Sequence, residues 1–221
     1  MLSKLLIRSK PLMNESLASY INRLCNENLC KVDWILEPSK MNSEKMHMTL
    51  NRISDDEMIF KIMEATGLSK DEINNMICNR FKINNTSDIL ILPLWCEDVK
   101  CCPLCLKEEY YHQIHWQLSY IQICLKHNLI LTNSSSYGKR IEMNALIHGY
   151  CKCGMDFSKL RYFMNEDENV YIHQCRIYEA LEIDQKLRRV YSRETASLEL
   201  SKEKFLYLYF LTELTQRFKY E

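Results

Sequence analysis

The stretch from Cys101 to His127, CCPLCLKEEYYHQIHWQLSYIQICLKH, contains two pairs of residues at the spacing of metal ligands. Cys102 and Cys105 form a C-x2-C pair, and Cys124 and His127 form a C-x2-H pair after 18 intervening residues. A two-residue gap lets both side chains of a tight turn reach one ion, and tetrahedral Zn2+ takes four thiolate or imidazole ligands. Four protein ligands leave no position for water, as in structural sites. The sequence therefore predicts one closed zinc site.

The composition is that of an ordinary globular protein. Of 221 residues, 47% are apolar and 26% are charged, which is enough for a buried core in one large domain or two small ones. Lys plus Arg equal Asp plus Glu at 29 each, so the formal net charge is zero. Proteins held on nucleic acid by phosphate contacts usually carry a positive excess. Any contact with DNA must therefore come from local patches.

Cysteine usage indicates a reducing compartment. The chain has 11 cysteines, an odd number that is unevenly clustered, which favours free thiols and metal ligands over disulfides. The first residues, MLSKLLIRSKP, contain too short an apolar run for a secretory signal. The most apolar segment elsewhere, FLYLYFL at 205–211, is far shorter than the ~20 residues of a membrane span. We expect a cytoplasmic bacterial protein without a membrane anchor.

Helices are expected throughout the first 80 residues. Asn14 can cap a helix whose apolar positions follow the i, i+3, i+4, i+7 pattern, namely Leu17, Tyr20, Ile21 and Leu24. Residues 54–57, SDDE, read as a capping box with Ser54 as the N-cap of a helix that ends at Gly67. Residues 69–72, SKDE, repeat the capping box and begin another helix. Two short helices joined by a tight turn form a helix-turn-helix pattern.

The second helix of such a pattern enters the major groove in DNA-binding proteins. Here it begins with Asp71 and Glu72, whose carboxylates would face the phosphates, so a hairpin that buries its own core or a partner's is an equal alternative. The side chains that could contact DNA are few, and they are Asn74, Asn75 and Arg80 in this region and Arg188 and Arg189 in a C-terminal helix.

Between the two ligand pairs, apolar and polar residues alternate from Ile114 to Tyr120. A period of two predicts a half-buried strand, with a short helix as the alternative. His112 and His115 are i, i+3 neighbours and could form a separate metal pair, although no carboxylate is placed to complete a catalytic site.

A second metal site is an open question. Cys151 and Cys153 form a C-x-C pair that would need two more ligands, and the remaining His148, Cys175 and Cys96 show no ligand spacing. The pair has three interpretations. It belongs to a second site whose other ligands lie far away in the sequence, it is the remnant of a lost site, or it is two ordinary thiols in a turn. Of these three, we favour the remnant.

The C-terminal part predicts two more helices. The first carries Cys175, Tyr178 and Leu181 on one face, and the second begins after Ser201. The expected fold is mainly α with a small β-containing zinc-finger module. Its parts are an N-terminal helix-turn-helix region (1–90), a zinc module (91–160) and a C-terminal helical region (161–221).

The order of these motifs resembles a known family. P-x2-N-E-S-L-x-S-Y-x2-R-L spans 11–24, and a helical hairpin, C-P-x-C-L, W-x7-C-x2-H-x-L-x-L and C-x-C-G-x-D-F follow. This combination is similar to the TniQ family, which includes the N-terminal part of TnsD-type proteins of Tn7-like transposons. The resemblance covers roughly positions 11–160, and the cysteine block with Trp116 is its most specific part.

The resemblance implies a non-catalytic protein that selects the insertion site of a transposon. Family members link a target-recognition module, either their own DNA-binding region or a CRISPR effector complex, to an AAA+ ATPase of the TnsC or TniB type. The implied fold is a helix-turn-helix region followed by zinc fingers. Position by position, the first zinc site falls on Cys102, Cys105, Cys124 and His127, and the second half of the second site on Cys151 and Cys153.

The chain departs from the family pattern in two places. The first half of the second zinc site falls on NSSSYG at 133–138, which has no cysteine, so a second zinc is in doubt. The long C-terminal extension of sequence-reading members is also missing, which favours an adaptor over an autonomous DNA reader. Whether the chain forms a homodimer is left open.

Two other classes are weighed against the adaptor. A zinc-dependent helix-turn-helix regulator would bind one DNA sequence, with an affinity that falls steeply with salt. A zinc deaminase would need H-x-E before P-C-x-x-C, and no H-x-E precedes this C-C-P-L-C. Nucleophile-elbow, P-loop and dinucleotide-binding motifs are also missing from the sequence. We therefore expect that the chain is not an enzyme.

Overall fold

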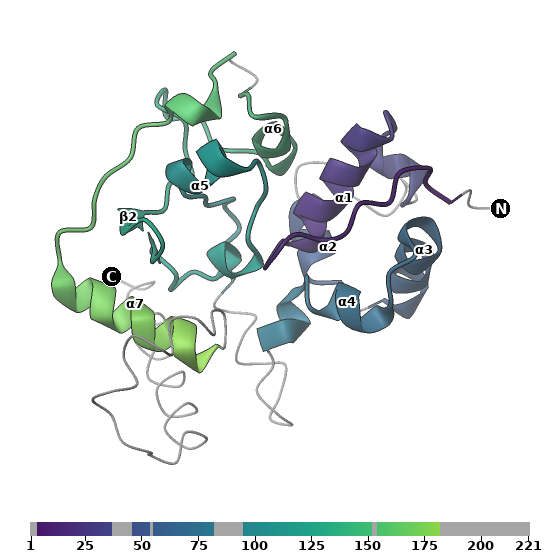
Figure 1. Ribbon diagram of the computed structural model, residues 1–221, viewed down its shortest axis with the longest axis horizontal. Helices are drawn as coiled ribbons and strands as arrows, with labels where there is room; N and C mark the ends of the chain where they lie inside the picture. Colours follow the sequence, from purple (N-terminus) through teal and green to yellow (C-terminus); the bar gives the residue numbers. More distant parts are fainter. Residues whose placement is uncertain (1–3, 37–45, 54, 82–94, 152–153, 182–221) are drawn as a thin grey trace.

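The computed structural model describes residues 4–36, 46–53, 55–81, 95–151 and 154–181. In these ranges the protein is mostly helical with one small sheet, as the sequence predicts (Figure 1). The α-helices are α1 (Leu17–Glu27), α2 (Met46–Asn51), α3 (Asp56–Thr66), α4 (Lys70–Asn74), α5 (Pro103–Glu108), α6 (Met143–His148) and α7 (Glu168–Ala180). Short 3-10 helices are η1 (Val32–Trp34), η4 (Cys78–Phe81), η6 (Ile114–Gln117) and η7 (Phe157–Lys159).

Helix α1 is the most deeply buried element of the N-terminal half. Its four apolar positions are all inaccessible to solvent, in agreement with the helical period of the sequence: Leu17, Tyr20, Ile21 and Leu24. The expected cap was wrong by two residues, because Ser16 is the N-cap and its side chain accepts a hydrogen bond from the Ser19 amide. Asn14 instead adopts the left-handed conformation, with φ of 59°, in the turn that leads into the helix.

Helices α3 and α4 form the expected hairpin. The N-cap of α3 is Asp55, whose carboxylate accepts from the Glu57 amide, rather than Ser54, which lies outside the described residues. Gly67 ends the helix in the left-handed conformation, with φ of 78°. The capping box of Ser69 and Glu72 is present at the start of α4. Whether this hairpin is a DNA-binding helix-turn-helix stays a prediction.

The only sheet in the described ranges is a two-stranded antiparallel ladder of β1 (Ile123–Cys124) and β2 (Leu129–Ile130). The strand predicted from 114 to 120 was wrong, because residues 114–117 form the 3-10 helix η6. Alternation predicts a solvated polar face, but both polar residues in η6, His115 and Gln117, are buried. Gln117 is held there by main-chain oxygens, since its amide donates to the carbonyls of Cys96 and Asp98.

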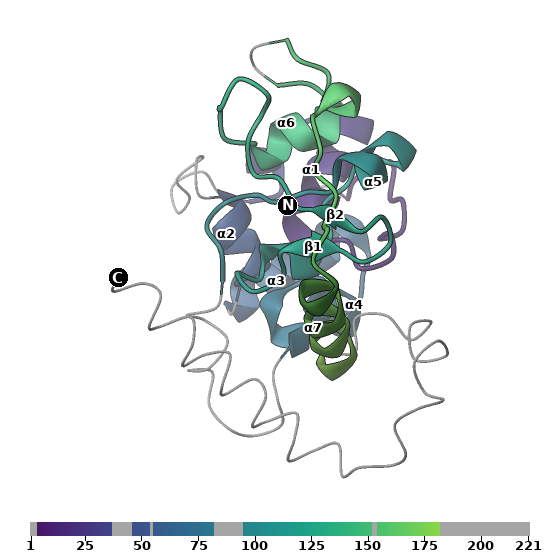
Figure 2. The same cartoon turned by 90° about the vertical axis from the view of Figure 1, so that its left-hand side faces the viewer.

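Helix α7 lies against the small sheet, as both views show (Figures 1 and 2). The Gln174 side-chain oxygen accepts from the Gln122 amide at 2.8 Å, and its amide donates to the Tyr120 carbonyl at 2.8 Å. The Tyr178 hydroxyl donates to the Ile123 carbonyl at 3.3 Å. The predicted inner face of this helix is confirmed by the burial of Cys175, Tyr178 and Leu181. The second C-terminal helix and Arg188 and Arg189 lie outside the described residues.

One continuous hydrophobic core runs from the N-terminal helices to α7. In Figure 1 the helices α1 to α4 lie on one side and the segment from residue 95 to α7 on the other. Helix α1 contacts α6 across this division. Within the segment from residue 95 to α7, α5 contacts η7. The expected boundaries at 90 and 160 stay a prediction. None of the helices in the described ranges is long and apolar enough to cross a membrane.

Candidate metal centre

Helix α5 positions the first pair of predicted ligands. Cys102 is the N-cap of this helix, Pro103 occupies its first position, and Cys105 lies one turn further on. Proline suits that position because its ring presets the helical backbone and it has no amide hydrogen to leave unpaired. Residues three apart on a helix lie on the same face, so the two thiols point to one side.

The β1–β2 hairpin positions the second pair. Cys124 is the last residue of β1, and the His127 amide donates to its carbonyl at 3.3 Å in the turn that follows. Asn128 completes that turn in the left-handed conformation, with φ of 51°. The turn therefore brings the imidazole back over the cysteine that opened it.

The structure brings all four predicted ligands together. Their ligand atoms lie within 4.8 Å of one another. His127 Nδ1 is 3.4 Å from the sulfurs of Cys102 and Cys105 and 3.8 Å from that of Cys124. The sulfurs of Cys105 and Cys124 are 3.7 Å apart. The three cysteines are buried and the histidine is half-buried.

These separations match the edges of a zinc tetrahedron. Zinc–sulfur bonds of about 2.3 Å and zinc–nitrogen bonds of about 2.0–2.1 Å give edges of about 3.8 Å between sulfurs and about 3.6 Å between sulfur and nitrogen. The measured distances of 3.7 Å and 3.4–3.8 Å agree with these values. The donor set of three thiols and one imidazole also suits zinc better than magnesium or calcium, which prefer oxygen ligands. The residues present therefore fit a closed tetrahedral metal site.

The cluster favours a thiolate. Hydrogen bonds from the Cys105 thiol, and then from the Cys124 thiol, hold the pKa of Cys102 well below its ordinary value. The same contacts raise the pKa of Cys105. Metals bind the thiolate rather than the thiol, so the lowered pKa of Cys102 favours the form that a metal would take. Neighbouring Cys101 is fully buried, and burial raises its pKa, so it is an inert core thiol outside the cluster.

Glu108 contacts the cluster and was not predicted from the sequence. Its carboxylate lies 3.2 Å from His127 Nε2 and also binds the ammonium of Lys126. A carboxylate on the outer ring nitrogen fixes the tautomer that leaves Nδ1 as the ligand. The signal was available in principle, because Glu108 follows Cys105 by three positions on α5 and so shares its face.

Of the second predicted ligand pair, the structure describes only Cys151. Among the described residues, no second group of three or more metal-ligating side chains is present. Cys151 is half-buried in a turn where its amide donates to the Met155 carbonyl at 2.8 Å. Cys153 lies outside the described residues. The second zinc therefore stays a prediction without structural support.

His112 and His115 are buried core residues. Among the described residues, neither belongs to a cluster of metal-ligating side chains. Both are buried, and burial lowers their pKa, that of His115 to about 3. His112 Nδ1 lies 3.0 Å from the Ser16 hydroxyl, and the His115 ring packs edge-on against Tyr178 with centroids 5.0 Å apart. These neutral imidazoles connect the metal-bearing segment to α1 on one side and to α7 on the other.

A buried polar network joins the N-terminal helix to the metal-bearing segment. The Ser16 amide donates to the His112 carbonyl at 2.8 Å, and the His112 amide donates to the Ser19 hydroxyl at 2.9 Å. Glu15 pairs with Gln113 in an antiparallel bridge. Residues nearly 100 positions apart in the sequence are thus fixed side by side.

Glu15 is the centre of this network. Its side chain is completely buried and forms an ion pair with Arg23 at 2.8 Å. It also accepts from the Leu12 amide at 2.9 Å and from the Ser19 hydroxyl at 3.1 Å. The lone pairs of the buried Glu15 carboxylate therefore have hydrogen-bond donors within reach, which compensates for their loss of water. The N-terminal motif of the sequence is accordingly the part that docks α1 onto the metal module.

The predicted DNA-contacting residues of the hairpin are partly accessible. Asn75 is exposed, whereas Asn74 and Arg80 are half-buried, and burial lowers the pKa of Arg80. The Arg80 guanidinium also packs over the Phe81 ring at 5.9 Å. Helix α4 has only five residues and begins with acidic side chains. Contact of these residues with DNA stays a prediction.

The sequence model of the TniQ family matches residues 6–131, which is more than half of the chain. The chain belongs to the TniQ family. A search of the curated proteins found no match.

The matched region of this TniQ-family chain contains both features described above. It begins before the N-terminal motif and ends directly after β2, so it includes α1, the buried Glu15 network and all four residues of the metal cluster. Membership associates the chain with Tn7-like transposition, in which family members are generally non-catalytic. Cys151 and α7 lie beyond the matched residues.

Proposed function

We propose that this TniQ-family chain is a non-catalytic adaptor for target-site selection. It links a target-recognition module, either target DNA or a CRISPR effector complex, to an AAA+ transposition ATPase of the TnsC or TniB type. The observation that carries this proposal is the family match across residues 6–131, in which the N-terminal helices and the metal cluster form one continuous core. A rigid body that presents two separate surfaces is what an adaptor needs.

The metal cluster has a structural role in this proposal. Zinc held by Cys102, Cys105, Cys124 and His127 would supply binding energy that orders the short α5 and the β1–β2 hairpin. Four protein ligands fill the tetrahedron, so no coordination position remains for a substrate or an activated water. Zinc chemistry at this site is therefore binding and not catalysis.

Direct sequence reading of DNA is not favoured. The net charge is zero, and Asp71 and Glu72 occupy the first turn of α4, where a recognition helix would approach phosphates. We expect weak, salt-dependent and sequence-indifferent binding to duplex DNA. The alternative, a zinc-dependent helix-turn-helix regulator, requires instead a strong preference for one sequence.

Co-elution with the ATPase tests the adaptor. The purified chain and the AAA+ ATPase encoded in the same element are mixed with ATP and analysed by size-exclusion chromatography. We expect a complex, and in a reconstituted transposition assay we expect targeted insertion to require the chain. Failure to form the complex, together with nanomolar binding to one DNA sequence at physiological salt, would favour the regulator.

A further inference from the structure

A groove at the end of α1 exposes large apolar side chains that the fold itself does not use. Its volume is about 650 Å³, and it is lined by the segment 4–6 on one side and by residues 28–34 on the other. Leu6 is 93% exposed, Leu29 95% and Trp34 62%, although each could have been polar without loss of core packing. The volume is within the range of about 300–1,000 Å³ that holds ligands in proteins.

Leu29 is the least expected of these side chains. Helix α1 ends in a Schellman turn, in which the Cys30 amide donates to the Cys25 carbonyl at 2.9 Å and the Leu29 amide donates to the Asn26 carbonyl at 3.2 Å. Glycine is usual at the Leu29 position because the backbone there is left-handed, with φ of 52°. A leucine at this position costs conformational energy and gains no burial in return, which points to a role outside the fold.

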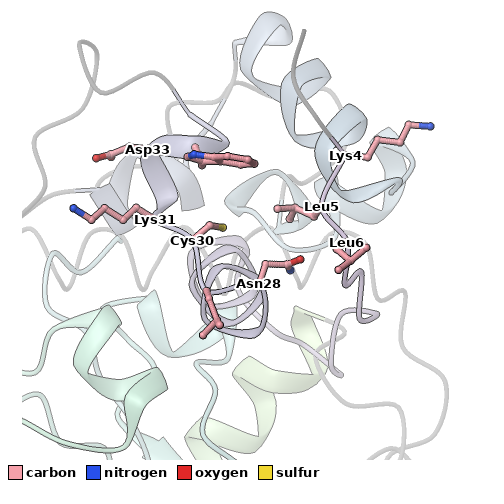
Figure 3. A pocket seen from close by; sticks show the side chains of 9 residues that line it. Lys4, Leu5, Leu6, Asn28, Cys30, Lys31 and Asp33 are labelled. Atoms are coloured by element: carbon pink, nitrogen blue, oxygen red, sulfur yellow. The ribbon is translucent and has the colours of Figure 1, made fainter.

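Figure 3 shows the charges around the groove. Lys4 lies on one side and Lys31 on the opposite side, with their charged ends pointing outward, and the Cys30 sulfur lies between them. Asp33 is the single acidic residue of the lining. An apolar floor between two ammonium groups is complementary to an apolar stripe flanked by carboxylates. The lining has two lysines and one aspartate, so a second copy of this chain would bring one net positive groove against another across a two-fold interface.

We propose that this groove binds an acidic, amphipathic helical segment of a partner protein. Two or three apolar side chains of one helix face would lie against Leu6, Leu29 and Trp34, and carboxylates at the edges of that face would pair with Lys4 and Lys31. Tryptophan is enriched among the residues that contribute most to protein interfaces, which assigns Trp34 as the anchor. This inference goes beyond the proposed function and does not depend on which partner supplies the segment.

The tryptophans of the chain make the groove directly observable. Trp34 is 62% exposed, whereas the other two, Trp95 and Trp116, are 6% and 1% exposed. A change in tryptophan emission on binding therefore reports on the groove. The experiment titrates the full-length, zinc-loaded chain with a tryptophan-free helical peptide that carries leucines at i, i+3, i+4 and i+7 and glutamates on either side. We expect a saturable blue shift, and no shift with the peptide in which lysines replace the glutamates.

Substitutions separate binding from folding. Leu29→Gly should weaken peptide binding by about tenfold or more through the loss of apolar contact. The same change should leave the melting temperature unchanged or raise it, since glycine suits the left-handed backbone. Tyr137→Ser, at a side chain 73% exposed and outside the groove, should leave the affinity unchanged.

Four results would overturn the proposal. They are the absence of a saturable shift, equal binding of the acidic and basic peptides, unchanged affinity in Leu29→Gly, and a blue shift that follows protein concentration without peptide. The last result would identify the groove as an interface between two copies of the chain.

Discussion

Helix α1 and the metal-bearing segment are held in place by different means. Helix α1 has 11 residues, a side-chain N-cap and an apolar face that is completely buried. The metal-bearing segment, residues 101–130, has an α-helix of six residues (α5), a 3-10 helix of four (η6) and strands of two, which are too short to be stable alone. We infer that apolar burial is sufficient to hold α1 in place, whereas the metal-bearing segment also needs a cross-link between distant side chains.

Removal of one metal ligand should have the largest effect. Structural zinc contributes about 10–16 kcal/mol in zinc-finger peptides, which is comparable with the net stability of a whole domain. We expect Cys105→Ser to lose zinc and to unfold the segment around α5, β1 and β2, with increased hydrogen exchange there and less change in α1. Cys96→Ser, at a half-buried cysteine outside the cluster, is the matched control and should keep both metal and melting temperature. Full metal retention in Cys105→Ser would contradict the assignment.

The buried ion pair should rank second. Glu15→Ala removes the carboxylate that pairs with the Arg23 guanidinium. Removing one partner of a buried ion pair lowers the free energy of unfolding by about 3–5 kcal/mol. Urea unfolding should show this loss. Glu27 bonds the same guanidinium at 3.0 Å but its side chain is 28% exposed, so Glu27→Ala should cost less than about 1 kcal/mol. Equal effects of the two changes would show that Glu15 is not the centre of the docking network.

Acid should destabilise the protein through its buried histidines. The folded-state pKa values of His112 and His115 are lowered by burial, that of His115 to about 3, whereas an unfolded histidine titrates near 6.5. Above about pH 6.5 both states are neutral and stability is unaffected by these groups. Below it the unfolded state binds more protons, so each histidine removes up to about 1.4 kcal/mol of stability per pH unit as the pH falls.

His115→Phe isolates this contribution. The ring and its contacts with Tyr178 and Trp116 are retained, and metal release in acid affects both proteins equally. Urea unfolding at pH 7.5, 6.5 and 5.5 should give a smaller slope for the variant, by about one proton. An identical pH dependence in the two proteins would mean that the pKa of His115 is not lowered in the folded state.

Loss of the carboxylate behind the metal ligand should have the smallest effect. Glu108→Gln keeps the size of the side chain but removes the charge that orients His127, and such partners contribute about 10–100-fold to metal affinity. Competition with a zinc chelator should show the decrease, with the fold intact at saturating zinc. Glu109→Gln, at the neighbouring carboxylate that is not among the described contacts of His127, should not change the affinity.

Much of this structure could be predicted from residue spacing. The C-x2-C and C-x2-H pairs identified the four clustered side chains, because each pair is fixed by a local turn. The helical period of α1 and the capping box of α4 were predicted for the same reason. The strand predicted at 114–120 failed because His115 and Gln117 are buried polar residues that find long-range main-chain and ring partners.

Long-range partners also explain what was missed. The pairing of Ser16 and Ser19 with His112 joins residues 93 and 96 positions apart, and no local pattern encodes it. The groove residues Leu29 and Trp34 were overlooked because an exposed apolar side chain has no periodic signature. Glu108 was overlooked because its partner, His127, lies on another element.

The most direct test of the central claim is X-ray absorption at the zinc edge of protein purified without added metal. We predict one zinc per chain, with three sulfurs at about 2.3 Å, one nitrogen at about 2.0–2.1 Å and no water oxygen. Protein without bound metal, or a first shell dominated by oxygen and nitrogen, would contradict the account.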